Sequence, residues 1–269
     1  MFSGRNKPAI GITGPDRGGY PAWFFTRIAV WRAGGRAIRI RPGRKVDPES
    51  LDGLILGGGA DIDPGRYADT IDDIAEHQKK GAGDEKESGG IVAWLMAPVI
   101  MIIRRLFSLG TIPVDLERDK LEHELLDIAV HKNWPILGIC RGAQFLNVYW
   151  GGNLHPDIID FYTEEPKIES VYPRKRIRIV EGTHLGSIFG KDSCLVNSLH
   201  NQAVNRPGPD IRFSATDLAG VVQAVEHKSY PFALGVQWHP EYLPQVKSQQ
   251  MIFRKLIRLA ATHNENEQE

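Results

Sequence analysis

Residues 135–143 read Pro-Ile-Leu-Gly-Ile-Cys-Arg-Gly-Ala, and this stretch decides the fold. Its apolar part, 135–139, predicts a short buried strand, and the chain from Ala143 onward predicts a helix. Outward from this stretch, strand-like and helix-like segments alternate along the first half of the chain. The strand-like segments cover residues 9–12, 37–40 and 51–56, and the helix-like segments cover 23–32 and 116–132. This alternation predicts an α/β fold with a mostly parallel central sheet and helices on both faces.

The second half of the chain has a different pattern. Residues 176–180 alternate charged and apolar side chains, which is typical of a half-exposed strand. Two strand-like segments at 221–226 and 233–236 predict a small antiparallel β element, and residues 251–259 predict a final amphipathic helix. Because no linker divides two cores, we expect one domain over residues 1–262, followed by a disordered tail over 263–269.

The composition argues against several classes of protein. The chain has 269 residues with 33 basic and 33 acidic side chains, and a formal net charge of zero argues against nucleic-acid binding. The two cysteines, Cys140 and Cys194, are too few for a disulfide framework. Residues 1–12 lack the apolar core of a signal peptide. We therefore expect a cytoplasmic protein with no nucleic-acid partner.

Cys140 is the candidate nucleophile. It lies in a Gly-x-Cys-x-Gly element over residues 138–142, directly between the predicted strand and the predicted helix. Small neighbours permit the strained turn of a nucleophile elbow, and the positive end of a helix dipole favours a thiolate. A buried core cysteine is the alternative interpretation, but the two flanking glycines argue against it. Cys194 has no such setting, and we expect it to be inert.

A nucleophilic cysteine needs a base and a group that orients this base. His239 and Glu241 lie two residues apart around Pro240, so in an extended segment their side chains project to the same side. The carboxylate would then hold the imidazole tautomer and stabilise the imidazolium. A His-x-Glu pair is often only a surface pair, but together with the elbow it predicts a Cys-His-Glu triad.

The candidate oxyanion hole combines two backbone segments. The glycines at 57–59 follow a predicted strand and can present N–H groups, and the N–H of Arg141 follows the nucleophile. A glycine-rich loop can instead cradle a phosphate. This loop, however, has neither of the common phosphate-binding glycine patterns and does not open directly onto a helix.

Taken together, these segments resemble the class I glutamine amidotransferase superfamily and, within it, the gamma-glutamyl-gamma-aminobutyrate hydrolase family. The resemblance covers nearly the whole chain. The cysteine and histidine motifs occur throughout the superfamily, whereas Ser-x-His-x-Gln at 198–202 and Asp-Ile-x-Pro at 61–64 are more particular to the hydrolase branch. The matching segments are 8–13, 57–64, 118–122, 135–144, 151–155, 196–202 and 235–241.

The resemblance implies a flavodoxin-like fold and the hydrolysis of a gamma-glutamyl amide. Cys140 would attack the delta-carbonyl carbon of the substrate and form a gamma-glutamyl thioester. His239, oriented by Glu241, would protonate the leaving amine and then activate water. Gly58 or Gly59 would offer an N–H group to the oxyanion, opposite the N–H that follows the nucleophile.

The resemblance also implies a site for a small-molecule gamma-glutamyl substrate. Gln144, together with the loop that carries His200 and Gln202, would lie near the glutamyl end of this substrate. The alternative for His200 is an ordinary hydrogen-bonded loop histidine. We expect no cofactor.

An insertion over about residues 70–113 departs from the family pattern. Its uncharged run at 88–103 would be roughly 24 Å long as a helix, shorter than the ~30 Å hydrocarbon core of a membrane. We therefore expect residues 91–107 to pack on their own domain, in a homodimer, or peripherally on the inner face of a membrane. Because the insertion would lie near the mouth of the site, the identity of the leaving amine stays open.

Three functions remain open at this point. The first is a free-standing gamma-glutamyl hydrolase, and the second is a glutaminase subunit that delivers ammonia to a separate synthase partner. The third is a membrane-associated binding protein with a dormant site. A metal site formed by His200, His239 and Glu241 with Asp61 or Asp63 is not expected, because the sequence has no tight pair of metal ligands.

Overall fold

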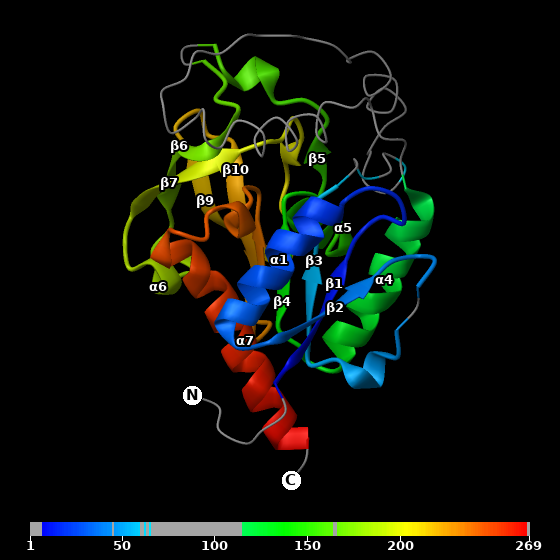
Figure 1. Ribbon diagram of the computed structural model, residues 1–269. Coiled ribbons are helices and arrows are strands. Elements are labelled where there is room, and N and C mark those ends of the chain that lie inside the picture. The colour runs from blue at the N-terminus through cyan, green and yellow to red at the C-terminus, as the bar shows by residue number, and fades with distance from the viewer. Residues whose placement is uncertain are drawn as a thin grey trace.

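The computed structural model describes residues 7–44, 46–59, 62, 65, 115–163 and 166–267. A nine-stranded sheet has the order β2-β1-β3-β4-β11-β10-β9-β6-β7, and a small antiparallel sheet pairs β5 with β8 (Figure 1). The strands are β1 (Ala9–Thr13), β2 (Arg36–Ile40), β3 (Gly53–Leu56), β4 (Ile136–Ile139), β5 (Leu154–His155), β6 (Ser170–Ile179), β7 (Ser193–Ser198), β8 (Ala203–Val204), β9 (Ile211–Asp217), β10 (Val222–His227) and β11 (Ala233–Val236). The α-helices are α1 (Tyr20–Ala33), α4 (Leu116–His131), α5 (Arg141–Tyr149), α6 (His184–Phe189) and α7 (Lys247–Glu267).

The parallel part of the large sheet consists of β2, β1, β3, β4 and β11, each parallel to its neighbour. All residues of β3, β4 and β11 are buried, as expected of parallel strands that are covered on both faces. Beyond β11, the sheet continues with the antiparallel strands β10, β9, β6 and β7. The predicted α/β fold class is confirmed.

Helices cover both faces of the sheet. On one face, Val30 of α1 and Leu256 of α7 pack in a core cluster with Ile12 of β1. Figure 1 shows α1 in blue and α7 in red in front of the strands. On the other face, Leu125 of α4 and Phe145 of α5 belong to a second core cluster. The sheet therefore lies between two layers of helix.

The element boundaries differ from the predicted ones mainly at the end of the chain. The helix α7 continues to Glu267, past residue 262, where the predicted domain ends. Once a helix has nucleated, each further residue adds one hydrogen bond at little cost, so a polar end can remain helical. The antiparallel pairing of β10 with β11 agrees with the prediction for residues 221–226 and 233–236.

Two groups of predicted residues lie outside the described part of the chain. They are the insertion at 70–113, which includes the proposed contact segment 91–107, and the two carboxylates Asp61 and Asp63. Within the described ranges, no helix combines the length and the apolar character that a membrane span requires.

The parallel strands bring the predicted site residues to one edge of the sheet. Leu56 of β3 lies opposite Gly138 of β4, and Val236 of β11 lies opposite Ile139. The carboxyl ends of β3, β4 and β11 therefore meet, and the segments that follow these strands carry the candidate site residues. Ligands of open α/β sheets bind at this edge.

Candidate active site

Cys140 lies in the sharp turn between β4 and α5. Its backbone has φ 53° and ψ −108°, a conformation that residues other than glycine rarely adopt. A Cβ at position 138 would overlap the backbone of Gly142, and a Cβ at Gly142 would overlap the carbonyl group of Leu56. The turn therefore needs both glycines of the Gly-x-Cys-x-Gly element, and it places Cys140 at the N-terminus of α5.

His239 and Glu241 follow β11, and both are buried. Nδ1 of His239 lies 2.7 Å from Oε1 of Glu241. The sequence analysis expected an extended segment, but Pro240 begins a short 3-10 helix that ends at Tyr242. The two side chains are thus brought together by a turn rather than by the alternation of a strand.

The electrostatic environment keeps the His239 imidazole protonated at neutral pH. Burial lowers the pKa of His239, but the charges of Glu241 and Cys140 and the hydrogen bonds of both side chains to the ring outweigh burial. Together they raise this pKa to about 10. An imidazole that interacts with a thiol on one side and a carboxylate on the other can support nucleophilic catalysis.

Two neighbouring side chains that the sequence analysis did not select fix the position of His239. Asn197 of β7 accepts a hydrogen bond from the backbone N–H of His239 and donates one to its carbonyl, both at 2.8 Å. The ring of Tyr242 stacks on the imidazole, with a centroid distance of 5.1 Å and an interplanar angle of 21°. Asn197 lies within the segment 196–202, which supported the family resemblance. Its place in that motif was the feature of the sequence from which it could have been selected.

Gln237 is a further residue that the sequence analysis did not select. Its Nε2 donates a hydrogen bond to the Cys140 sulfur at 3.6 Å. Gln144 of α5 donates to Oε1 of Gln237 at 3.1 Å and to the backbone carbonyl of Gln202 at 2.9 Å. These contacts connect the predicted substrate-binding residues to Cys140.

His200 belongs to the same group of contacts. Its Nδ1 lies 2.9 Å from the carbonyl oxygen of Gln202, and because a carbonyl only accepts, Nδ1 carries the hydrogen. Burial, with the positive charge of Lys175, lowers the pKa of His200 to about 3, so the ring is neutral at neutral pH. Its Nε2 is buried and has no hydrogen-bond partner among the described residues. This nitrogen is available to accept a hydrogen bond from a ligand.

The glycine loop, residues 57–59, lies against His239 and Cys140. A Cβ added at Gly58 would lie only 2.9 Å from Cε1 of His239. Gly59 has a positive φ of 152°, and a Cβ there would overlap a guanidinium nitrogen of Arg118. The structure thus places Gly58, one of the two predicted oxyanion-hole glycines, beside the catalytic candidates.

The structure also describes the surroundings of the second cysteine and some of the residues considered for a metal site. Cys194 on β7 is half-buried, and burial raises the pKa of its thiol to about 12. Within the described ranges, no group of three or more His, Cys, Asp or Glu side chains is arranged to hold a metal ion.

Comparisons with known proteins agree with this architecture. Residues 108–241 match the family model described as Peptidase C26. A Mycobacterium tuberculosis protein named "Putative glutamine amidotransferase Rv2859c" is 31% identical over 259 residues, covering 88% of this chain and 71% of that protein. "Gamma-glutamyl-gamma-aminobutyrate hydrolase PuuD" of Escherichia coli K12 is 38% identical over 138 residues, covering 48% of this chain and 54% of that protein.

A solved structure supports the fold alone. The crystal structure of a "putative gmp synthase subunit a protein" from Thermoplasma acidophilum has a TM-score of 0.61 at 20% identity, covering 98% of this chain and 100% of that chain. The M. tuberculosis relative, the family model and the fold agree with one another. The chain therefore belongs to the glutamine amidotransferase-like family.

Proposed function

We propose that this protein hydrolyses gamma-glutamyl amides to glutamate and an amine. The observation that carries the proposal is the buried contact of Cys140, His239 and Glu241 at the carboxyl edge of the sheet. The match to the E. coli gamma-glutamyl-gamma-aminobutyrate hydrolase over half of the chain supports a gamma-glutamyl substrate. Residues outside that match are free to recognise a different amine.

The first half of the reaction forms a thioester. The Cys140 thiolate adds to the delta-carbonyl carbon, and the carbonyl electron pair moves to oxygen, where N–H groups of the glycine loop and Arg141 stabilise it. The oxyanion then collapses, and the carbon–nitrogen bond breaks. The imidazolium of His239 gives its proton to the departing amine. Glutamate is left bound to the Cys140 sulfur through its delta-carbonyl carbon.

The second half hydrolyses the thioester. The neutral imidazole of His239 takes a proton from water while the water oxygen adds to the thioester carbon. Collapse of this second oxyanion breaks the carbon–sulfur bond, releases glutamate and restores the thiolate–imidazolium pair. Glu241 stabilises the positive charge on the ring and holds its orientation in both steps.

The glutamyl end of the substrate is assigned to the group around Gln144, Gln202 and His200. The neutral His200 ring can accept a hydrogen bond through Nε2, and the alpha-ammonium group of a glutamyl substrate is a matching donor. The contact of Gln144 with Gln237 connects this group to the nucleophile, which supports a single site.

A second candidate is a glutaminase that supplies ammonia to a separate synthase. The observation that favours it is the fold shared with a protein whose title names a subunit of a synthase. Such an enzyme would act on glutamine itself, and its activity alone would be low until the partner binds.

A substrate panel distinguishes the two candidates. Purified protein is mixed with gamma-glutamyl-aminobutyrate, gamma-glutamyl anilide and glutamine, and free glutamate and amine are measured in the same tubes. We expect release from at least one substituted gamma-glutamyl amide at ~10-fold or more the rate with glutamine, because pockets discriminate leaving groups by this much. Isoglutamine, an alpha-amide, is the matched control and should not be cleaved. Slow ammonia release from glutamine alone would favour the second candidate, and no cleavage of any gamma-glutamyl amide would contradict the proposal.

The Glu241→Gln variant tests the electrostatic role of the carboxylate. The negative charge of Glu241 raises the pKa of His239, so its loss should lower this pKa from about 10. Because amine departure needs the imidazolium, activity falls as pH rises through this pKa, and the alkaline limb should move to lower pH by ~1 unit or more. The measurement is kcat/KM between pH 6 and pH 11, with the exposed Glu124→Gln as control. An unmoved alkaline limb would argue against this role.

A further inference from the structure

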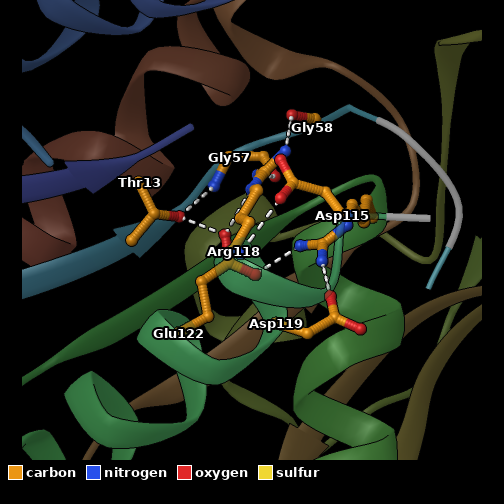
Figure 2. Close-up of polar contacts among 8 residues, drawn as sticks. Thr13, Gly57, Gly58, Asp115, Arg118, Asp119 and Glu122 are labelled. Carbon is orange, nitrogen blue, oxygen red and sulfur yellow. Dashed lines mark hydrogen bonds and ion pairs between the residues drawn. The ribbon is translucent and has the colours of Figure 1, made fainter. Parts of the chain in front are cut away.

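Four charged side chains of α4 and α5 form a buried ion cluster, which comprises Arg118, Asp119, Glu122 and Arg141. Each is at most 1% exposed. Nε of Arg118 donates to Oε1 of Glu122 at 2.8 Å, and the Arg141 guanidinium contacts both Glu122 and Asp119. Figure 2 shows three of these side chains beside the glycine loop. The two positive and two negative charges balance.

Stability alone is a weak reason for such a cluster, because desolvation of buried charges often cancels their attraction. The contacts with the backbone point to a role in positioning. Nη2 of Arg118 donates to the carbonyl of Gly57 at 2.7 Å, and Nη1 donates to the carbonyl of Gly58 at 3.1 Å (Figure 2). A guanidinium can hold two carbonyls at once because its donors form a rigid planar fork.

These two contacts orient the N–H groups of the glycine loop. In a trans peptide, a carbonyl and the following N–H point in opposite directions. Because Arg118 holds the first two carbonyls of the loop, the N–H groups of its second and third residues face away from the guanidinium. Gly58 also borders the candidate catalytic pair, since a Cβ there would lie 2.9 Å from Cε1 of His239 and 3.7 Å from Cβ of Cys140.

Thr13, at the end of β1, engages the remaining N–H of the loop. Its Oγ1 accepts a hydrogen bond from the N–H of Gly57 at 3.3 Å and donates one to Oε1 of Glu122 at 2.6 Å (Figure 2). The first N–H of the loop is therefore occupied. Within the described part of the chain, the N–H groups of Gly58 and Gly59 make no hydrogen bond, so both can donate to an oxyanion.

The same cluster reaches the opposite half of the oxyanion hole. The backbone N–H there belongs to Arg141, which directly follows Cys140, and the Arg141 side chain is held by Glu122 and Asp119. Glu122 thus binds one guanidinium through Oε1 and the other through Oε2. One carboxylate connects the residue that orients the glycine loop with the residue that follows the nucleophile.

We propose that Arg118 and Glu122 are positioning residues that set the separation between the two halves of the oxyanion hole. Asp119 supports this arrangement by binding the Arg141 guanidinium, and Thr13 supports it by bridging the N–H of Gly57 and the carboxylate of Glu122. The inference rests on the proposed role of Cys140 as nucleophile, but it does not depend on the identity of the amide that the protein hydrolyses.

The test compares two reactions of Cys140 in the Arg118→Lys variant. In acylation by p-nitrophenyl acetate, the acetyl group moves to the sulfur through an oxyanion and p-nitrophenolate leaves, whereas alkylation by iodoacetamide forms no oxyanion. Lysine keeps the charge but, as a single point donor, cannot hold both carbonyls. We expect acylation to slow by ~10²-fold, the cost of a misplaced oxyanion donor, with alkylation close to that of the wild type. With a gamma-glutamyl amide, kcat should fall while KM changes little.

Two further variants serve as partner and control. Thr13→Val removes the hydroxyl bridge at nearly constant volume and should slow acylation by ~10-fold, the equivalent of about one lost hydrogen bond. Arg212→Lys is the matched control, because Arg212 also pairs with a buried carboxylate, Glu226, and holds a backbone carbonyl, that of Gly182. It should leave both reactions unchanged.

The inference is overturned if Arg118→Lys and Thr13→Val are acylated at the wild-type rate. It is also overturned if acylation and alkylation slow by the same factor, because that pattern indicates a general loss of structure. A wild type that is acylated rapidly, loses acylation in both variants and yet cleaves no gamma-glutamyl amide would refute the proposed function and leave the inference standing.

Discussion

Turnover of gamma-glutamyl amides by the Cys140→Ala variant should be at least ~10³-fold below that of the wild type, because no other group can form the thioester. The fold should survive, since alanine fits the space of the cysteine and meets the same positive φ of 53°. Steady-state rates of glutamate release and the thermal unfolding midpoint are the measurements.

Cys194→Ala is the matched control for this variant. Cys194 is half-buried and its thiol has a pKa raised by burial to about 12, so its removal should leave turnover unchanged. Near-wild-type turnover in Cys140→Ala would contradict covalent catalysis at this position. Loss of turnover in both cysteine variants would indicate damage to the fold instead.

The His239→Gln variant should lose ~10² to 10⁴-fold in turnover, the range that general acid–base groups contribute. An amine departs as a neutral molecule only if it receives a proton, and His239, with its pKa raised to about 10, is the group that carries this proton. p-Nitrophenolate leaves without a proton. Acylation by p-nitrophenyl acetate should therefore fall less than amide cleavage.

The ratio of the rate of amide cleavage to the rate of acylation by p-nitrophenyl acetate measures the role of His239 as a general acid. His123→Gln is a suitable control, because His123 lies half-exposed on α4, where it contacts Asp127 and the ring of Tyr149. Equal losses in ester and amide reactions of His239→Gln would assign the histidine to activation of the thiol alone. An unchanged amide rate would remove it from the mechanism.

Much of the site was predictable because it depends on local patterns. The two glycines around Cys140 predicted a tight turn. The structure shows that side chains at Gly138 and Gly142 would overlap backbone atoms. Parallel strands then bring the segments after β3, β4 and β11 to one edge, whatever their separation in sequence. The pairing of His239 with Glu241 was also predicted, although a turn rather than a strand produces it.

The buried ion cluster was not predictable in the same way. The apolar periodicity of residues 116–132 correctly indicates a helix that buries Leu125 and Ala129, but Arg118 and Glu122 in its first turns are buried as well. Charged side chains usually predict exposure. No local sequence pattern indicates that Arg141 pairs with Glu122, which lies 19 residues earlier in the chain. Such pairing depends on tertiary structure.

The contacts of Gln237 and Asn197 were missed for a related reason. Both residues lie in segments that supported the resemblance, yet an amide side chain has no chemistry that singles it out in a sequence. Only the structure shows that the Gln237 amide donates a hydrogen bond to the Cys140 sulfur and that the Asn197 amide makes two hydrogen bonds with the backbone of His239.

The most direct test of the central claim is the intact mass of the protein during turnover of a gamma-glutamyl amide, quenched in acid. The account predicts a transient mass increase of one glutamyl group, located on the peptide that carries Cys140 and absent from Cys140→Ala. Glutamate release with no adduct at any time point, or an adduct on a different residue, would contradict a thioester at Cys140.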